Sequence, residues 1–517
     1  MFKLKLNPIK NITYKKVNYA NFQNGINTTY DEYSTPLSYS KNAYNFDFKN
    51  GALKTGLGVT KLIINAFRDD EINPFYKEIA TPEGVDILAI WTFDRYVDDG
   101  TGYDTNIIIY GSDKNLYFTT FLSSLFRFSK IDTGDCVFNS IPTAIKYKID
   151  GHDCIIFTTP EDGMYVYTPT TFRKYVKNCP PITSMCVHYE RLFATVDKEQ
   201  ISLWFSDDLD PTNWNVSSVE AGFINMVDAR GKLNKVLSFK DYVYVFREYG
   251  ISKLTAYGNQ EDFNVTHLFL SSTKIYENTV CVCGDVVLMM LKDGIYAFDG
   301  IGVQKLNLNI ENMLLANKNA VASYYNGKYY LACCLKFPDE EKIGCEEGEY
   351  TNNALIELDF EKGEFTITRG IDISYLYSSQ DVAYSKLFCC YKLNGVSNVG
   401  VIENCGAVLD NPTIKFWRSP FTNFGYPNKT KILKEIYFNS KDEVEVIVET
   451  EKTLKKFVAK PKNNKIKINA NIIGNEFAIH FKSTSKDVYI ANPVVIVGVY
   501  EWKQITVKLH IKKLKIF

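Results

Sequence analysis

Few residues of this 517-residue sequence have the types and spacing that catalysis usually needs. Histidine is the commonest general base, and it is also a frequent metal ligand, but the five histidines are far apart along the chain. None lies in an HExxH or His-x-His pattern, and the sequence lacks a glycine-rich phosphate loop and a G-x-S-x-G turn. We therefore expect no catalytic residue, no cofactor and no metal. The histidines are His152, His188, His267, His480 and His510.

Two acidic stretches could in principle gather oxygen ligands around a cation. Asp98–Asp104 (DDGTGYD) has carboxylates close together, but it lacks the ordered spacing and the final glutamate of an EF-hand loop. The run Asp339–Glu341 is followed by further glutamates and lies between two strand-like segments, where charge runs usually form solvated loops. We expect neither stretch to bind a metal.

The turn Ser206–Trp214 (SDDLDPTNW) is the feature that comes nearest to an enzyme motif. Sialidase-type propellers contain Ser-x-Asp-x-Gly-x-Thr-Trp turns, which this segment resembles superficially. Here the glycine is missing, the tryptophan falls one position late, and no arginine triad for a sialic-acid carboxylate is evident. A propeller fold alone does not confer this activity, so glycoside hydrolysis remains only an alternative. We expect Trp214 to be a structural ring that packs on the layer below it.

The twelve cysteines look like small buried hydrophobic residues. Cys333–Cys334 and Cys389–Cys390 are adjacent pairs in strand-like runs, where neighbouring side chains point to opposite faces. Cys281 and Cys283 share a face, but no second pair at zinc-like spacing accompanies them. We expect free thiols and a reducing environment.

Composition favours an all-β protein. Aromatic residues make up 14% of the chain, and such side chains suit half-buried pleated sheets. The formal net charge is −1, whereas dedicated nucleic-acid binders usually have a basic excess. The amino terminus does not resemble a signal peptide, and no apolar run approaches the roughly 20 residues that span a membrane.

The pattern of side chains alternates with a period near two almost throughout, and the one short helical candidate is Ile310–Asn319. Strand-like runs recur in six clusters spaced by roughly 45 to 50 residues, the period of four-stranded propeller blades. The clusters begin near residues 85, 143, 183, 235, 279 and 320.

A seventh cluster, between residues 375 and 403, lacks a clear fourth strand. The hairpin Ala43–Gly56 could supply it and so close the ring, which would remove exposed sheet edges. We predict a β-propeller of about seven four-stranded blades across residues 61–410, with six blades as the alternative. Residues 1–60 would form an extended N-terminal arm with the closing hairpin.

The pattern of residue types changes after residue 410. Prolines in loop-like positions precede strands with strict alternation, such as Glu443–Glu449, which predicts a separate C-terminal β-sandwich over residues 411–517. The last segment, Lys503–Phe517, alternates lysine with apolar residues. It fits either a lysine-protected edge strand or a strand donated to a neighbouring subunit.

Three local patterns resemble the β-propeller structural proteins of bacteriophage tails and necks. The first opens with NFQNGINT at Asn21–Thr28, followed by Pro36 and by Ala43–Lys54. The second is F-S-x-x-x-x-P-x-x-W, followed by GISKL at Gly250–Leu254 and DGIYAFDG at Asp293–Gly300. The third is a looser FG-x-P-x-x-K pattern. The single residues that carry the second and third patterns are Phe205, Ser206, Pro211 and Trp214, and Phe424, Gly425, Pro427, Lys429, Leu433 and Ile436.

The resemblance implies a non-enzymatic virion protein, such as the nozzle of a short tail or a ring of the neck or tail. It implies a homo-oligomeric ring that contacts other tail or neck proteins, and genomic DNA only in passage. Such a protein would be assembled in the host cytoplasm and would end in the virion. The alternative is a tail protein whose propeller loops bind a host receptor or glycan.

Overall fold

The computed structural model describes residues 10–48, 51–66, 75–97, 102–120, 126–168, 173–217, 220–315, 317–339, 351–380 and 385–502. The chain divides into two compact units. One unit comprises Gly56–Thr413, and the other combines Met1–Thr55 with Ile414–Phe517. No helix in these described ranges is long and apolar enough to cross a membrane.

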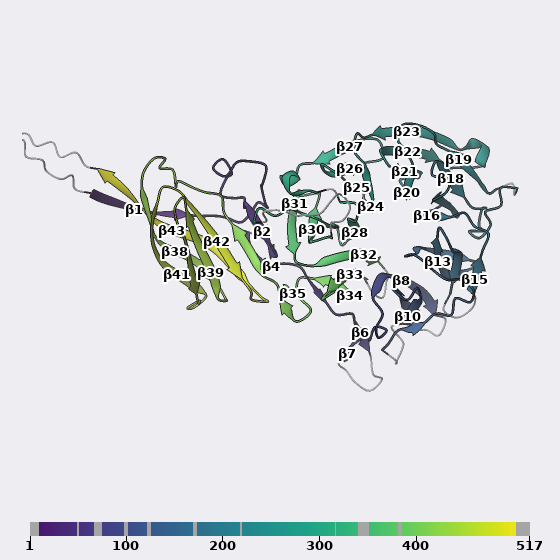
Figure 1. Cartoon of the computed structure of the whole chain (residues 1–517), viewed down its shortest axis with the longest axis horizontal. Helices are drawn as coiled ribbons and strands as arrows, with labels where there is room; N and C mark the ends of the chain where they lie inside the picture. The colour runs from purple at the N-terminus through teal and green to yellow at the C-terminus, as the bar shows by residue number, and fades with distance from the viewer. Residues whose placement is uncertain are drawn as a thin grey trace, which may run out of the picture. The chain divides into compact units, whose positions relative to one another are not determined.

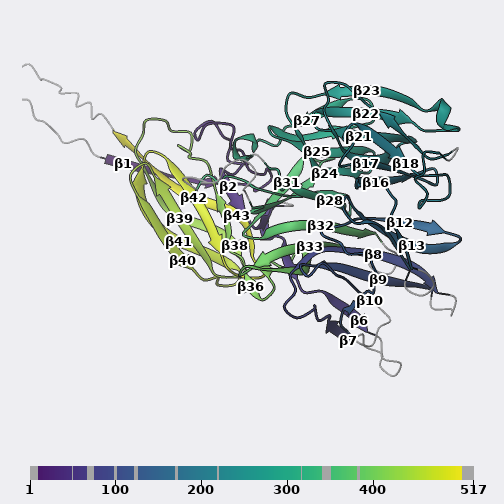
Figure 2. The same cartoon turned by 45° about the vertical axis from the view of Figure 1, so that its right-hand side comes forward.

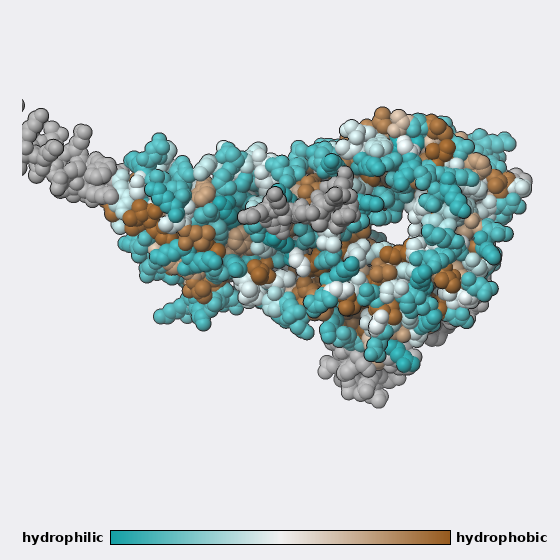
Figure 3. All heavy atoms as spheres, in the orientation of Figure 1, coloured by the Kyte–Doolittle hydropathy of each residue, from teal (hydrophilic) through white to brown (hydrophobic). Residues whose placement is uncertain are grey.

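The unit Gly56–Thr413 is a β-propeller of seven blades, arranged as a ring around an opening (Figures 1 and 3). In each of the first six blades, four strands that follow one another in sequence pair antiparallel with their neighbours. The first three blades consist of β8 (Ile87–Val97), β9 (Gly102–Gly111), β10 (Leu116–Thr120) and β11 (Ser129–Lys130); β12 (Thr143–Ile149), β13 (His152–Thr159), β14 (Gly163–Tyr167) and β15 (Arg173–Val176); and β16 (Ile182–His188), β17 (Arg191–Val196), β18 (Ser202–Phe205) and β19 (Gly222–Asn225).

The next three blades continue the same order. They consist of β20 (Leu233–Phe239), β21 (Tyr242–Arg247), β22 (Gly250–Thr255) and β23 (Asn264–Leu270); β24 (Ile275–Cys283), β25 (Val286–Leu291), β26 (Gly294–Phe298) and β27 (Val303–Leu306); and β28 (Val321–Tyr325), β29 (Lys328–Cys333), β30 (Ala354–Asp359) and β31 (Glu364–Arg369). Figure 2 shows β21, β22 and β23 of the fourth blade lying side by side.

The seventh blade closes the ring with a strand from the other end of the unit. Its order is β32 (Asp372–Gln380), β33 (Ser385–Leu393), β34 (Val396–Glu403) and then β5 (Gly58–Thr60). The short strands β35 (Ala407–Val408) and β36 (Asn411–Pro412) extend the same sheet beyond β5. The first strand of this blade, β32, contacts β8 of the first blade, which completes the circle.

The structure corrects two sequence-based expectations. The closing strand is β5, because Val401–Glu403 pairs with Gly58–Thr60, whereas the strands of Ala43–Gly56 belong to the other unit. The expected helix at Ile310–Asn319 is reduced to one 3-10 turn, η3 (Glu311–Met313), between two blades. A single such turn suffices for a short connector, and the other described 3-10 turn, η2 (Gln260–Asp262), plays the same part between β22 and β23.

The blades are joined by apolar side chains that face the neighbouring sheet. One buried cluster combines Phe157 and Tyr165 of the second blade with Trp91 of the first. Comparable clusters lie between the second and third, third and fourth, fourth and fifth, and sixth and seventh blades, and another contains Phe388 of the seventh blade with Ile107 of the first. Because each sheet is covered on both faces, inner strands such as β17 are buried along their whole length instead of alternating between buried and exposed residues.

A two-stranded hairpin lies between β5 and the first blade, formed by β6 (Ile63–Ala66) and β7 (Phe75–Glu78). It pairs with no blade among the described residues.

The second unit is a β-sandwich that uses both ends of the chain. One sheet runs β3 (Phe46–Asp47), β4 (Ala52–Thr55), β43 (Tyr489–Trp502), β38 (Lys431–Ser440) and β41 (Lys465–Gly474), and β1 (Lys10–Asn18) also pairs with β43. The other sheet runs β2 (Asn42–Tyr44), β37 (Lys415–Arg418), β42 (Phe477–Ser483), β39 (Val444–Thr450) and β40 (Leu454–Ala459).

The two sheets pack face to face through aromatic and aliphatic side chains. Phe438 of the first sheet and Phe481 of the second have ring centroids 5.2 Å apart. Strand β41 shows why the layers form, since its residues alternate strictly between buried and exposed. The expectation of an extended N-terminal arm is therefore corrected, because the N-terminal segment provides β1 to β4 of this unit, in addition to the C-terminal strands that the sequence predicts.

Candidate functional site

The first phage-like pattern lies in the core of the sandwich. Phe22 is fully buried, although its φ of 47° is unusual for a bulky residue. Its ring meets Trp417 edge-on at 4.9 Å and Phe481 at 5.9 Å. The N-terminal segment is thus held in place by the strands of the other chain end.

The third pattern also packs on strand β42. Phe424 lies 6.1 Å from the ring of Tyr19 and 5.7 Å from that of Phe477. The hydroxyl of Tyr19 lies 2.5 Å from Ser419 Oγ and accepts a hydrogen bond from the Ile479 amide at 3.2 Å. Burial raises the pKa of Tyr19, so the phenol stays neutral as a hydrogen-bonding group. Tyr19 and Ser419, which are 400 residues apart in sequence and lie close to the first and third patterns, therefore share one buried hydrogen bond.

A charged network joins these segments a second time. Arg418 donates to Glu32 at 2.7 Å and to Glu449 at 3.1 Å. His480 Nε2 lies 2.9 Å from the same carboxylate of Glu449. The hydrogen bond from His480, with Arg418 nearby, lowers the pKa of Glu449 to about 2 even though burial opposes the shift. The network fixes the loop that contains Glu32 onto the sheet.

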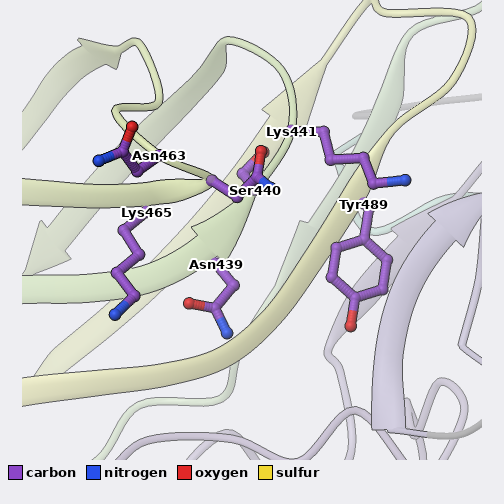
Figure 4. Close-up of a pocket in the computed structure, with 7 residues that line it drawn as sticks. Asn439, Ser440, Lys441, Asn463, Lys465 and Tyr489 are labelled. Carbon is purple, nitrogen blue, oxygen red and sulfur yellow. The ribbon is translucent and has the colours of Figure 1, made fainter.

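A pocket of about 280 Å³ lies in the sandwich unit, and Figure 4 shows the residues that line it. It is formed by the β38–β39 turn, the β40–β41 turn and the start of β43. The side chains of Asn439, Lys465 and Tyr489 point to the same side in this view. The full lining is Asn439, Ser440, Lys441, Asn463, Asn464, Lys465 and Tyr489.

In the propeller, the Ser206–Trp214 turn is structural, as the sequence predicts for its tryptophan. Trp214 is only 5% exposed and packs with apolar residues of the second and third blades. Its indole N–H donates to the carbonyl oxygen of Pro211 at 3.0 Å. Asp210 accepts from the amide and hydroxyl of Thr212. The turn's hydrogen bonds are thus made largely within the turn itself.

A serine, a histidine and an aspartate do meet in the fourth blade, at residues that the sequence analysis did not bring together. Ser252 Oγ lies 3.0 Å from His267 Nδ1, and Asp228 Oδ2 lies 3.4 Å from that same nitrogen. A catalytic triad needs the two partners on opposite ring nitrogens, so that the imidazole can pass on a proton. Because both partners face Nδ1 here, the arrangement does not provide that relay.

Asp228 serves instead as the centre of a structural ion cluster. Its two oxygens each lie 2.6 Å from an arginine, Arg247 and Arg230. Arg247 is fully buried and also donates to the carbonyl oxygens of Met226 and Gly231. Burial alone would raise the pKa of Asp228, but the hydrogen bonds from Arg230 and the charge of Arg247 hold it below its usual value.

The remaining sequence candidates are dispersed. His152 is exposed at the start of β13, His188 is buried at the end of β16, and His480 belongs to the Glu449 network. His510 lies outside the described residues, as do residues 98–101 of the acidic stretch and residues 340–350 of the acidic loop. Asp339, at the border of that loop, pairs with Arg369 at 2.8 Å. Within the described ranges, no group of three or more His, Cys, Asp or Glu could hold a metal.

The cysteines behave as predicted wherever they are described. Eleven are free, and most of them are buried. Burial raises the pKa of Cys154 to about 12 and that of Cys179 to about 11, which keeps both thiols protonated.

No family model matches the sequence, and no curated protein matches it. Among solved structures, the chain is similar to BBS1N in its complex with ARL6DN, from a crystal soaked with lead, at TM-score 0.39 and 11% identity. That match covers 66% of this chain and 97% of the other. The mercury-soaked crystal of the same complex gives TM-score 0.39, 10% identity, and 67% and 98% coverage. Kluyveromyces lactis Hsv2 gives TM-score 0.31, 8% identity, and 64% and 98% coverage. The propeller assignment itself stands on the seven sheets of this chain.

Proposed function

We propose that this protein is a non-enzymatic structural component of a bacteriophage virion, part of the tail or neck through which DNA passes. The observation that carries the proposal is that the first and third phage-like patterns both pack on strand β42, Phe22 against Phe481 and Phe424 against Phe477. Sequence patterns from opposite chain ends that pack on the same strands are what one shared structural module would produce.

The architecture suits such a role. A propeller closed by β5 has no free sheet edge where its first and last strands meet, and its blades are packed on both faces, so the disc resists deformation.

The sandwich has an edge strand that a neighbouring subunit could contact. Strand β1 pairs with β43 on one side, and none of the other described strands pairs with its second side. Such edges accept strands from partner chains.

In this proposal, copies of the chain form a ring through heterologous contacts, which close when the rotation between subunits permits. Other tail or neck proteins bind above and below the ring, and genomic DNA only passes through it. The protein is assembled in the host cytoplasm and ends in the virion.

The direct test is the composition and structure of purified particles. We expect mass spectrometry to find the protein in the virion and cryo-EM to place it in a ring of the tail or neck. A variant reduced to Gly56–Thr413 should keep a folded propeller, because this unit is compact by itself, but should yield particles without functional tails.

Two outcomes would contradict the proposal. The protein could be absent from purified particles, which would remove the structural role. Alternatively, the Gly56–Thr413 variant could give complete particles that fail only to adsorb, which would favour the receptor- or glycan-binding function. As a control, the substitution Lys441→Gln should leave both units folded, because Lys441 is exposed.

A further inference from the structure

One face of the propeller is unusually acidic over the third, fourth and fifth blades. In a four-stranded blade, the turn between the first and second strands and the loop between the third and fourth strands lie at the same end of the sheet. In these three blades the described parts of those segments have a single basic side chain, Lys240. Their exposed carboxylates include Glu190, Asp208, Asp210, Asp241, Asp285 and Asp299.

The acidic face has an exposed aromatic pair at its centre. Tyr189, in the β16–β17 turn, is 51% exposed, and Tyr257, in the β22–β23 loop, is 74% exposed. Their ring centroids are 6.0 Å apart, and the planes meet at 76°. Large exposed rings on a polar surface are characteristic of contact sites, and aromatic faces attract cations.

The backbone of this turn is strained in a way that presents the ring. Tyr189 and Glu190 have φ values of 45° and 66°, in the left-handed region. The equivalent turns of the second and sixth blades have Asp150–Gly151 and Asn326–Gly327, which tolerate that conformation. A tyrosine and a glutamate at these positions are unfavourable for folding, and such outliers often mark functional surfaces.

A buried nitrogen lies directly beneath the pair. His188 is 4% exposed, and its ring lies 4.2 Å from that of Tyr189. Its Nδ1 is hydrogen-bonded to Ser238 Oγ at 2.9 Å, whereas its Nε2 has no hydrogen-bond partner among the described residues.

We propose that this acidic, aromatic face binds the C-terminal segment Lys503–Phe517 of a second copy of the chain. The proposal rests on the ring assembly described above and supplies one of its heterologous contacts. The segment contains five lysines and one histidine and no acidic residue, so its charge complements the face. It begins where β43 ends at Trp502, and its fifteen residues, if extended, would reach about 50 Å.

The other open surface of the chain is a poorer acceptor for this segment. The edge strand β1 exposes Lys15 and Lys16, which would repel a lysine-rich strand. The acidic face offers the opposite charge together with rings onto which lysine side chains can pack. It would also repel DNA, since phosphates are anionic.

The test uses the chain shortened after Trp502 and a fluorescent synthetic peptide of residues 503–517. We expect anisotropy to show binding that weakens as salt rises, with little binding of a peptide in which every lysine is glutamine. The variants Tyr257→Ala and Asp241→Asn should each lower the affinity by about tenfold or more. Tyr30→Ala is the matched control, because Tyr30 is 56% exposed on the sandwich unit.

The oligomeric state gives a second readout. The full chain should form rings in analytical ultracentrifugation, and both the shortened chain and Tyr257→Ala should shift towards monomers. Absence of peptide binding, or equal binding by Tyr257→Ala, would overturn the proposal even if the protein is found in a virion ring. Rings that persist without residues 503–517, while Asp241→Asn prevents incorporation into particles, would assign the face to a different basic partner.

Discussion

The third blade and the sandwich achieve buried aromatic cores by opposite routes. In the blade, Trp214 is held by Pro211 of its own turn and by strands of the adjacent blade. In the sandwich, Tyr19 meets Ser419 across 400 positions of sequence. The propeller is built from local pieces that repeat, whereas the sandwich takes its strands from both ends of the chain.

The largest effect on folding is expected from deleting Met1–Thr55. We expect the sandwich to fail to fold, because it loses β1 to β4 and the Phe22 ring, while Gly56–Thr413 still folds. Calorimetry of the full chain should show two transitions, and the shortened chain should keep only that of the propeller. Retention of both transitions would show that the C-terminal strands form a sandwich by themselves.

Replacing Trp214 by alanine should have the next largest effect, and it should be confined to the propeller. We expect the free energy of unfolding of that unit to fall by about 3 to 5 kcal/mol, because a buried ring leaves a cavity between two blades. Urea unfolding followed by tryptophan fluorescence measures the loss. If the variant unfolds like the wild type, the turn is not part of the core.

Asp228→Asn should destabilise the fourth blade by about 3 kcal/mol, since it leaves the buried Arg247 without its counterion. The surface pair Lys61–Glu78 is a suitable contrast, and Glu78→Gln should change stability by less than about 1 kcal/mol. An equal effect of the two substitutions would mean that burial of Arg247 does not matter.

The smallest expected effect is a pH dependence of the sandwich. The folded-state pKa of Glu449 is depressed from 4.5 to about 2, so its stabilising contribution is present above the unfolded value and is lost as the pH falls between these values. Glu449→Gln should flatten the stability of the sandwich across that acidic range. An unchanged acid dependence in this variant would assign the effect to other carboxylates.

Much of the propeller was accessible from sequence because its contacts are local. Alternating strands at regular spacing, with Asn326–Gly327 in a tight turn, specify blades that pair with their neighbours in order. The strand that closes the ring, β5, could not be predicted from the sequence in the same way. Val59 and its neighbours form a strand too short to stand out, and only its pairing with Ile402 identifies it.

The candidate surfaces depended even more on the tertiary structure. Tyr189 and Tyr257 lie in different blades, and no spacing in the sequence signals that their rings meet. Ser252, His267 and Asp228 show the converse, since three residue types that suggest catalysis come together in a geometry that excludes the relay.

The sequence by itself determined that this is an all-β protein of repeated blades with free thiols and a separate C-terminal region. The physical reason is that side-chain alternation and turn chemistry act over a few residues and are visible in any window. Only the tertiary structure decided that β5 closes the ring, that the N-terminal segment completes the sandwich, and that acidic loops of three blades share one face. Those features depend on contacts between residues distant in sequence, whose free energy exists only once the chain has brought them together.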